Sequence, residues 1–520
     1  MSKPFSLAKP SYFVYSENVK SYPINAALNR DTAVILARLQ ALLGEESCEA
    51  YIVGSIVRNL VARHDRADID IAVDGDALVI GKRLADKLNT HYVVLDDTFG
   101  VARLLPRDED TWQIDIVTLQ ETLEQDLMRR DFSINALAIN MAQMQLQESS
   151  INAAILDVCN GMQDLQNKII RAVSEQAFRD DPIRLLRGVR LSNELKFDID
   201  EQTSALMQRE HALISTVSPE RVREELLRLF ALTDTHNSVV LMHRLGILTS
   251  IIPELAPTLQ MEQSTEHTWD VFHHSARSID AFDFLCRRAG WEFYGTDVLA
   301  DVPWEDGVKS YFDTIVSPPA TRLVLTKLSA LLHDIAKPQT KIINDAGRVR
   351  FYRHAQQGAP IAAAILERLR FSHSEIKFIE TIVRHHLHPV QLSEPGEAPS
   401  KRAVYRFRRD LEDAGIATLY FSLADHLATR GPNLESADWG WHAGIVRQIL
   451  DECEKGTPPD KMPLLLDGND IQNEFGLKPG KQLGQLLEEL REAQAAGEIS
   501  TRQQGLDYVK KLLEEGIPSS

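Results

Sequence analysis

The stretch that decides the fold starts at Ala50-Tyr-Ile-Val-Gly54-Ser55 and resumes, after a segment of helical pattern, at Asp68-Ile-Asp-Ile-Ala-Val73. The first part is an apolar run that enters a glycine turn, which is typical of a buried strand. The second part alternates acidic and apolar residues, so it predicts a strand with Asp68 and Asp70 on one face. Strand and helix patterns alternate from there to about residue 172, which favours a domain of mixed α and β structure.

The predicted secondary structure changes after about residue 175. Strand patterns nearly vanish and amphipathic helical segments continue to the end of the chain. The first residues are punctuated by prolines and predict an irregular leader. We therefore expect five parts: a leader (1–30), a head (31–172), a helical neck (173–255), a helical body rich in histidine (256–455) and a helical tail (456–520).

The bulk composition excludes several classes of protein. The 520 residues carry a formal charge of −18, which excludes a uniformly basic coat for nucleic acid but leaves room for a local basic groove. The four cysteines are far apart and predict neither a zinc ribbon nor a disulfide framework. The start has no apolar segment of a secretory signal, and no apolar run approaches the ~20 residues of a membrane span. We expect a cytoplasmic protein without membrane contact; nothing in the sequence predicts its oligomeric state.

Candidate catalytic residues follow from the deciding stretch. Gly54 and Ser55 stand where a turn leads into a helix, so backbone N–H groups there can approach a phosphate closely. Asp68 and Asp70 supply the hard oxygen ligands that Mg²⁺ prefers, and such a pair can hold one or two ions. Asp115, on a second alternating strand, is the candidate for a third catalytic carboxylate. Taken alone, an Asp-x-Asp strand favours a solvated sheet edge, but the Gly54-Ser55 turn one helix upstream favours the catalytic interpretation.

A second polar cluster lies in Phe178-Arg-Asp-Asp-Pro-Ile-Arg-Leu-Leu-Arg-Gly-Val-Arg-Leu191. The spacing places Asp181 and three arginines along one side of a helix that we expect to start near Asp181. These arginines are Arg184, Arg187 and Arg190. An aspartate that accepts and an arginine that donates can imitate the Watson–Crick partner of a base, and further arginines suit a triphosphate. Solvated arginines on a capped helix would explain the charge but not the order of the whole set.

Taken together, four ordered segments resemble the motifs of class II tRNA nucleotidyltransferases and bacterial poly(A) polymerases. They are Gly54–Asp70, Arg129–Leu137, Asp157–Leu165 and Asp180–Arg190, and the similarity extends over about residues 48–255. The resemblance implies an α+β head of the polymerase-beta-like type, followed by an all-α neck, body and tail. It also implies attack of an RNA 3′-OH on the α-phosphate of CTP or ATP, with tRNA or another RNA as partner.

The resemblance assigns roles residue by residue. Asp68 and Asp70 would bind Mg²⁺. The nucleotide-binding residues would be Gly54, Ser55 and Arg58 at the triphosphate, Arg130 and Asp131 at the sugar, Asp181 and Arg184 at the base, and Arg187 and Arg190 at phosphates. Three positions depart from the family pattern: Ser55 replaces a glycine, Asp180 replaces a glutamate and Asn59 replaces an aspartate. Asn59 is the least usual of the three and bears on any helix-capping or arginine-orienting role of that position.

The histidine-rich body carries a second constellation around Leu331-Leu-His-Asp-Ile-Ala-Lys-Pro338. With histidines upstream and downstream, it resembles the HD superfamily of metal phosphohydrolases. The ligands that this resemblance implies are His274, His333, Asp334, His354, His386 and Asp425. Imidazole and carboxylate together suit Mn²⁺, Ni²⁺, iron or Mg²⁺. The alternative is a set of capping and core histidines, and the adjacent His273 and His385 compete for two of the ligand positions.

The leading functional hypothesis is addition of CMP and AMP to the 3′ end of tRNA, the CCA-adding reaction, with Mg²⁺ in the head. A rival in the same class uses ATP alone, as an A-adding enzyme or a poly(A) polymerase. We expect residues 97–107 to form a flexible segment that separates these two specificities. A rival from another class is an HD phosphohydrolase with an inactive head. A non-catalytic RNA-binding scaffold is disfavoured, because it would need neither metal site.

Overall fold

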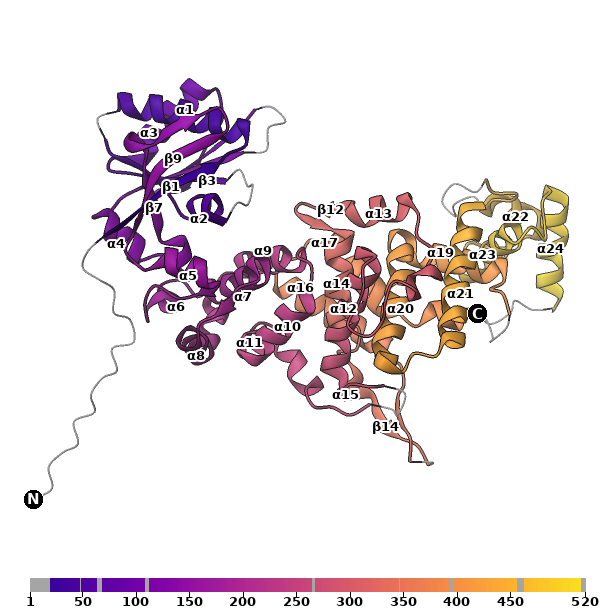
Figure 1. The fold of residues 1–520 in the computed structure, drawn as a ribbon. Helices are drawn as coiled ribbons and strands as arrows, with labels where there is room; N and C mark the ends of the chain where they lie inside the picture. The colour runs from indigo at the N-terminus through magenta and orange to yellow at the C-terminus, as the bar shows by residue number, and fades with distance from the viewer. Residues whose placement is uncertain are drawn as a thin grey trace, which may run out of the picture. The chain divides into compact units, whose positions relative to one another are not determined.

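The structure is a computed structural model that describes residues 19–46, 48–62, 68–107, 112–263, 267–345, 347–392, 397–455 and 463–515 (Figure 1). The chain divides into two compact units. The first comprises Met1–Ser218 and Leu241–Ile251, and the second comprises Pro219–Val240 and Ile252–Ser520. The large sheet belongs to the first unit, whereas the second is built mainly from helices, as the sequence predicts.

A mixed sheet of nine strands forms the core of the head, in the order β1-β9-β7-β2-β3-β6-β5-β4 with β8 beside β9. Its strands are β1 (Lys20–Ala27), β2 (Ala50–Val53), β3 (Asp68–Val73), β4 (His91–Asp96), β5 (Val101–Leu105), β6 (Gln113–Thr118), β7 (Leu137–Asn140), β8 (Gln145–Gln147) and β9 (Ser150–Asp157). Its helices are α1 (Arg30–Glu45), α2 (Ser55–Ala62), α3 (Ala77–Leu88), α4 (Leu123–Met128) and α5 (Gly161–Asn167). The predicted α+β head is confirmed.

The register of the central strands brings the predicted carboxylates together. β3 pairs with β2 in antiparallel and with β6 in parallel orientation, and Asp70 lies opposite Asp115 of β6. Ile69 and Ile71 are buried on the other face of β3, which fixes the alternating strand in this register. Asp68 and Asp70 therefore emerge on the same face.

The predicted leader is partly a strand. Lys20–Ala27 pairs with β9 in an antiparallel ladder at the edge of the sheet, so the expectation of an irregular leader up to residue 30 is wrong for this segment. Proline cannot donate to a ladder, and Pro23 therefore hides the strand pattern. An edge strand tolerates proline because only one of its sides needs hydrogen-bond partners. Residues 1–18 lie outside the described part of the chain.

A second difference concerns residues 97–107, which were expected to be flexible. Val101–Leu105 is strand β5, which pairs with both β4 and β6, and its Ala102 and Leu104 are fully buried. Arg103 interrupts this short apolar run and so conceals the strand in the sequence. The strand is stable because Arg103 has a partner on β6, described below.

Helical segments follow the head, as predicted for the neck, whose bounds of 173–255 stay a prediction. They are α6 (Ala177–Asp180), α7 (Arg184–Leu195), α8 (Glu201–Glu210), α9 (Pro219–Phe230), α10 (Thr235–Arg244) and α11 (Ile247–Ile251). A two-residue strand, β11 (Asp198–Ile199), pairs with β10 (Ile169–Ile170). Helix α7 begins at Arg184 rather than near Asp181. Asp181 takes an extended conformation, with φ −150° and ψ 98°, because the residue before a proline is disfavoured in the helical region.

The body consists of ten α-helices among the described residues, with two short hairpins between them. The helices are α12 (Val271–Arg287), α13 (Asp306–Asp313), α14 (Arg322–Leu332), α15 (Lys337–Thr340), α16 (His354–Arg368), α17 (His373–His385), α18 (His388–Gln391), α19 (Lys401–Leu411), α20 (Gly415–Arg430) and α21 (Ser436–Lys455). The hairpins are β12 (Ile315–Ser317) with β13 (Ala320–Thr321), and β14 (Lys341–Ile343) with β15 (Val349–Phe351). α12 packs against α14 and α20, and α17 packs against α14 and α16, which gathers the helices that carry the predicted HD residues.

The tail folds around a small core of its own. Its helices are α22 (Gly468–Phe475), α23 (Lys481–Ala495) and α24 (Arg502–Glu515). The core includes Leu466, Ile471, Leu486, Leu490 and Val509. Ion pairs fix α23 to α19 of the body: Arg402 with Glu489, Arg406 with Glu492, and Arg409 with Glu488. In the described part of the chain, no helix combines the length and the apolar character needed to cross a membrane.

Candidate active site and candidate metal centre

The head site begins with a close approach between a turn and two side chains. Gly54 has φ +77°, a left-handed conformation that favours glycine. A Cβ atom at this position would stand 3.0 Å from both the Arg130 guanidinium and the Asp70 carboxylate. The turn, Arg130 and Asp70 therefore surround one small space, beside the start of α2, where Ser55 is the first helical residue. Backbone N–H groups at a helix start favour an anionic ligand.

Asp70 is the carboxylate most affected by these surroundings. Burial raises its pKa to about 6; the charge of Arg130 opposes this rise, whereas Asp115 and Asp68 add to it. Neighbouring carboxylates repel one another unless a cation neutralises them. Asp68 and Asp70, on one face of β3, therefore offer the oxygen ligands that a divalent metal prefers, and Asp115 adds negative charge beside Asp70.

Asp115 has a fixed partner in the structure. Arg103, at the neighbouring position of β5, donates from Nε and Nη2 to the two carboxylate oxygens at 2.7 and 2.8 Å. A bidentate pair of this kind holds the carboxylate in one orientation. Sequence reasoning missed Arg103, because its position opposite Asp115 follows from the pairing of β5 with β6 and not from any local motif.

Arg58 belongs to a buried network. The residue is 4% exposed, and its guanidinium donates to Oδ1 of Asn59 and, at 2.5 Å, to Oδ1 of Asn135. Asn135 donates in turn to Asp131, which accepts from Arg187 at 3.0 Å. Three residues predicted to bind the nucleotide are thus joined through Asn135, which sequence reasoning missed. Asn59 accepts from Arg58 and so orients the arginine at the position where the family normally has aspartate.

The ion pair with Arg187 determines the charge of Asp131. Burial works against ionisation, but Arg187 and the hydrogen bond from Asn135 outweigh it and lower the pKa of Asp131 to about 2. The carboxylate is therefore negative at neutral pH and is already engaged in the network. A role at the sugar of the nucleotide stays a prediction for Asp131.

The remaining neck residues are held by neighbours of different kinds. Arg184 donates to the backbone carbonyls of Arg129, Arg130 and Ala177, so it lies beside the Arg130 segment of the head site. Arg190 pairs with Glu194, one turn further along its own helix, at 2.5 Å. Asp181 stands at the end of α6, ahead of the helix start. The predicted contacts of these residues with base and phosphates stay predictions.

The six predicted HD residues converge in the body. His274 comes from α12, His333 and Asp334 follow α14, His354 opens α16, His386 follows α17, and Asp425 lies in α20. The Nε2 atom of His274 lies 2.9 Å from Asp425, that of His333 lies 3.1 Å from Asp334, and those of His354 and His386 lie 3.3 Å apart. Two subsets have the spacing of metal ligands: His274, His333 and Asp425, and His333, Asp334 and His386.

The adjacent histidines lie outside this cluster. The His273 side chain is about half exposed and contacts Asp270, which caps the same helix. His385 contacts the ring of His388. The arrangement therefore favours His274 and His386 as the ligands at the two ambiguous positions.

The donor atoms of the cluster fit a metal ion. Nδ1 of His333, His354 and His386 lies 2.8–2.9 Å from a backbone carbonyl oxygen, which assigns the proton to Nδ1 and leaves a lone pair on each Nε2. Both oxygens of Asp334 and one of Asp425 are buried without a hydrogen bond of ordinary geometry, although cationic groups lie nearby. Buried acceptors that gather around one point, as the carboxylate oxygens and the Nε2 atoms do here, are what a bound cation would satisfy.

In the absence of a cation the cluster attracts a proton. Burial disfavours charge on His333, but Asp334 and Asp425 outweigh it and raise the pKa of His333 to about 10. Lys337, which sequence reasoning missed, adds a positive charge 2.6 Å from Asp334. The signal for Lys337 was its spacing, because a lysine three residues after Asp334 lies on the same side of the chain turn.

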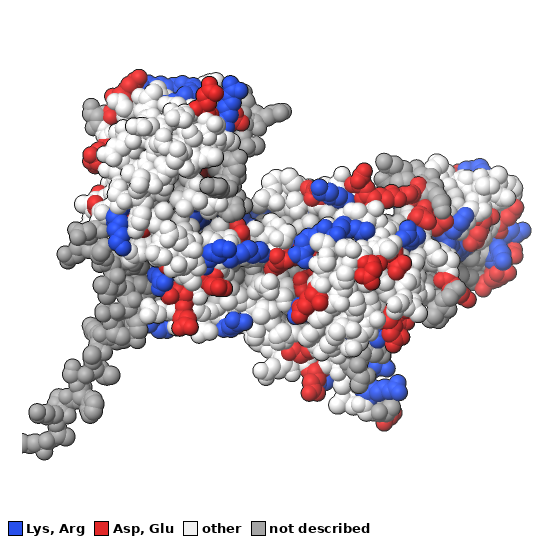
Figure 2. All heavy atoms as spheres, in the orientation of Figure 1, with Lys and Arg blue, Asp and Glu red and all other residues white. Residues whose placement is uncertain are grey.

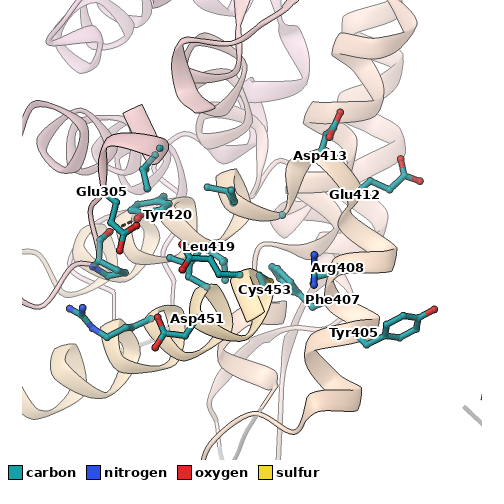
Figure 3. A pocket seen from close by; sticks show the side chains of 18 of the residues that line it. Glu305, Tyr405, Phe407, Arg408, Glu412, Asp413, Leu419, Tyr420, Asp451 and Cys453 are labelled. Atoms are coloured by element: carbon teal, nitrogen blue, oxygen red, sulfur yellow. Dashed lines mark hydrogen bonds between the residues drawn. The ribbon is translucent and has the colours of Figure 1, made fainter. Parts of the chain in front are cut away.

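A large cavity in the same unit lies away from this cluster. It has a volume of about 1440 Å³ and is lined by residues of α13, α19, α20, α21 and the tail (Figure 3). Aromatic side chains such as Tyr405 and Tyr420 line it together with acidic ones such as Glu305 and Asp451. Acidic residues outnumber arginines in the lining, so the cavity lacks the positive field that a phosphate ligand requires.

Three family models match successive parts of the chain. A poly A polymerase head domain matches residues 50–171, a probable RNA and SrmB-binding site of polymerase A matches 196–259, and an HD domain matches 305–430. An A-adding tRNA nucleotidyltransferase of Deinococcus radiodurans is 30% identical over 90% of this chain and 96% of its own length. The chain belongs to the tRNA nucleotidyltransferase and poly(A) polymerase family.

Further similarities cover nearly the whole of this nucleotidyltransferase. A CC-adding tRNA nucleotidyltransferase of Thermus thermophilus is 28% identical over 89% of the chain and 93% of its own length. The fold is similar to that of the Thermotoga maritima CCA-adding enzyme complexed with tRNA, with a TM-score of 0.56 and 19% identity over 94% and 99% of the two chains. His274 lies ahead of the segment that matches the HD domain, although the structure places it in the cluster.

Proposed function

We propose that this nucleotidyltransferase adds CMP and AMP to the 3′ end of tRNA. Its relatives named above act on tRNA, and they are similar to it over nearly their full lengths. The observation that carries the proposal is the grouping of Asp68, Asp70 and Asp115 beside the Gly54–Ser55 turn. This grouping combines carboxylates for a metal with a backbone suited to a triphosphate.

One group of residues in the head would hold the metal, and another would hold the nucleotide. Asp68 and Asp70 would hold Mg²⁺, which would supply activation of the attacking 3′-OH and neutralisation of the pyrophosphate charge. Arg103 keeps Asp115 oriented toward the same face. The turn at Gly54 and the Arg130 guanidinium, which lies beside Asp70, would hold phosphate oxygens. Because these groups are fixed before the nucleotide binds, the substrates would meet an ordered site.

The neck would determine the choice of base. Arg184 is anchored to backbone carbonyls of the Arg129–Arg130 segment, so its guanidinium is ordered and close to the nucleotide site. Together with Asp181 it would present one acceptor and the N–H groups that these carbonyls leave unengaged to the base. Arg187 would act through Asp131 and the buried asparagine network, since its guanidinium is already paired there.

A second candidate is addition of AMP alone. The Deinococcus radiodurans relative is an A-adding enzyme, and its similarity extends over 90% of this chain. The two candidates share the chemistry of the head and differ only in which nucleotide and which tRNA end are accepted.

We further propose that the HD cluster holds a divalent transition metal. Four imidazoles and two carboxylates favour Mn²⁺, Ni²⁺ or iron over Mg²⁺, because imidazole nitrogen suits the softer ions. All four cysteines are free thiols, which is compatible with the proposed location of the protein in a reducing cytoplasm.

The experiment uses three tRNA transcripts, which end before CCA, after the first two C residues, or after complete CCA. Each is incubated with Mg²⁺ and CTP, ATP or both, and products are sized at nucleotide resolution. CCA addition predicts three added nucleotides on the first transcript and none on the third. A-addition predicts extension of only the second transcript, by one nucleotide. An ATP-dependent ladder on all three would replace the proposal with poly(A) synthesis, and no extension of any transcript would overturn it.

A further inference from the structure

The hairpin formed by β14 and β15 is a basic projection on an acidic protein. Residues 341–353 carry four cations and one carboxylate, whereas the whole chain has a formal charge of −18. The cations are Lys341, Arg348, Arg350 and Arg353, and the carboxylate is Asp345. Figure 1 shows the hairpin extending beyond the helices of the body, and Figure 2 shows Lys and Arg side chains on this projection.

These arginines are not occupied by internal ion pairs. Arg348 and Arg353 are exposed, and Arg350 donates to the backbone carbonyl of its neighbour Val349. Within the described residues, no acidic side chain pairs with any of the three, whereas most other arginines of the body have a carboxylate partner. Their charges therefore remain available to an external anion.

The hairpin combines these cations with an exposed aromatic ring. The register pairs Ile342 with Arg350 of β15, Arg348 directly precedes this strand, and Tyr352 directly follows it. Tyr352 is 63% exposed and Ile342 is 46% exposed. Cations that follow a phosphate backbone, together with an exposed ring on which a base can stack, are the usual means of binding single-stranded nucleic acid.

Phe351 of β15 connects the hairpin to the HD cluster. The Phe351 carbonyl oxygen lies 2.8 Å from Nδ1 of His354 and so orients that ring. The Phe351 ring lies 5.3 Å from Nζ of Lys337, which in turn contacts Asp334. The two ends of the hairpin thus lead directly from Lys337 and into His354, so a strand bound on the hairpin would run beside the cluster.

We propose that the β14–β15 hairpin binds the sugar-phosphate backbone of single-stranded RNA next to the HD cluster. The exposed tyrosine favours an unpaired strand over a duplex, because only unpaired bases can stack on it. RNA is the anion to expect in this family, although the proposal does not depend on the transfer reaction in the head. An acidic protein surface would use the arginines but would not require the ring.

The test compares two charge-reversal variants of the full-length protein. R348E/R350E changes the hairpin, and K309E/K401E, at exposed positions elsewhere in the body, produces the same net charge. Binding of a short fluorescein-labelled single-stranded RNA is followed by anisotropy over a series of salt concentrations. Loss of two phosphate contacts should reduce the slope of log K against log salt by about 1.4 and the affinity by about tenfold, relative to the control variant. Y352L should weaken binding by about fivefold without changing the slope.

A second readout separates this site from RNA bound at the head. Photo-crosslinking of thiouridine-containing RNA to the wild-type protein should label the peptide that contains Tyr352, and R348E/R350E should abolish that label while retaining crosslinks elsewhere. Thermal unfolding of each variant checks that the fold is intact. Equal affinity and slope in the two charge-reversal variants, or no crosslink to the hairpin, would overturn the proposal. A failed nucleotide-transfer assay would leave these measurements unaffected, so the two proposals fail separately.

Discussion

The head and the body each gather carboxylates around a candidate metal position, but with different partners. In the head, Asp68 and Asp70 lie on a strand beside arginines, which can also hold phosphates. In the body, Asp334 and Asp425 are surrounded by imidazoles, and Asp334 is almost completely enclosed. The head therefore suits a metal that arrives with its nucleotide, whereas the body suits a resident ion. The difference shows that the partners of a carboxylate, more than the carboxylate itself, determine what a metal site can do.

The largest expected effect tests the enclosed side of this comparison. His386→Ala should lower the content of bound transition metal by about tenfold or more, because Nε2 of His386 faces the cluster. His385→Ala removes an imidazole from the preceding position, which contacts His388 instead, and should leave the metal content unchanged. Metal content per protein is measured by mass spectrometry after purification without added metal. Equal loss in both variants would mean that the cluster is not the binding site.

The second effect concerns the support of the head site. Asn135→Ala should destabilise the protein by about 2 kcal/mol, because it leaves both Arg58 and Asp131 short of a buried partner. Denaturant unfolding measures this change. The same variant should also raise the KM for the nucleotide, since Arg58 loses its orientation. An unchanged unfolding free energy would show that the network contributes nothing to the rigidity of the head.

A smaller effect is expected at Asn59, the least usual departure from the family pattern. Asn59→Ala should raise the KM for the nucleotide by about threefold to tenfold, because Asn59 accepts two hydrogen bonds from Arg58. Asn59→Asp keeps an acceptor there and should restore or improve the KM. If alanine and aspartate behaved alike, the orienting role of this position would be refuted.

The smallest effect is a pH dependence of stabilisation by Mg²⁺. The pKa of Asp70 is raised to about 6 by burial, so without metal its contribution to stability is present below its ordinary pKa of 3.8 and is lost as pH rises through 6. Mg²⁺ binds the ionised carboxylate and should therefore raise the melting temperature more at pH 7.5 than at pH 5.5, by roughly a few degrees. Asp70→Asn should abolish that difference; a shift independent of pH in the wild-type protein would contradict this interpretation.

The sequence alone predicts the secondary-structure elements that local residue patterns encode. The strand at Asp68–Val73, the helix after Gly54 and the helices of the neck and tail follow from periodicity and turn residues. Sequence reasoning failed at Lys20–Ala27, because a proline concealed an edge strand whose stability comes from pairing with β9, more than a hundred residues away. It also failed at residues 101–105, where strand pairing places Arg103 opposite Asp115 as its ion-pair partner.

The candidate sites divide in the same way. Asp68, Asp70 and the His333-Asp334 pair could be predicted, because short local motifs identify these residues as candidate metal ligands. Asn135 could not, because it acts only through contacts with Arg58 and Asp131 that folding creates. Internal partners also order the arginines that are predicted to bind the nucleotide. These contacts result from packing in the folded protein, so the spacing of the arginines in the sequence does not predict them.

The central claim is that the head carries out nucleotide transfer, and one variant tests it most directly. Asp68→Asn/Asp70→Asn preserves the shape of both side chains and removes the charge that would hold Mg²⁺. In a single-turnover extension of tRNA lacking its terminal CCA, this protein should be slower than the wild type by about a thousandfold or more. It should retain the metal content of its HD cluster, which shows that the body is intact. Extension at near wild-type rate by this variant would contradict the claim and move the chemistry away from the head.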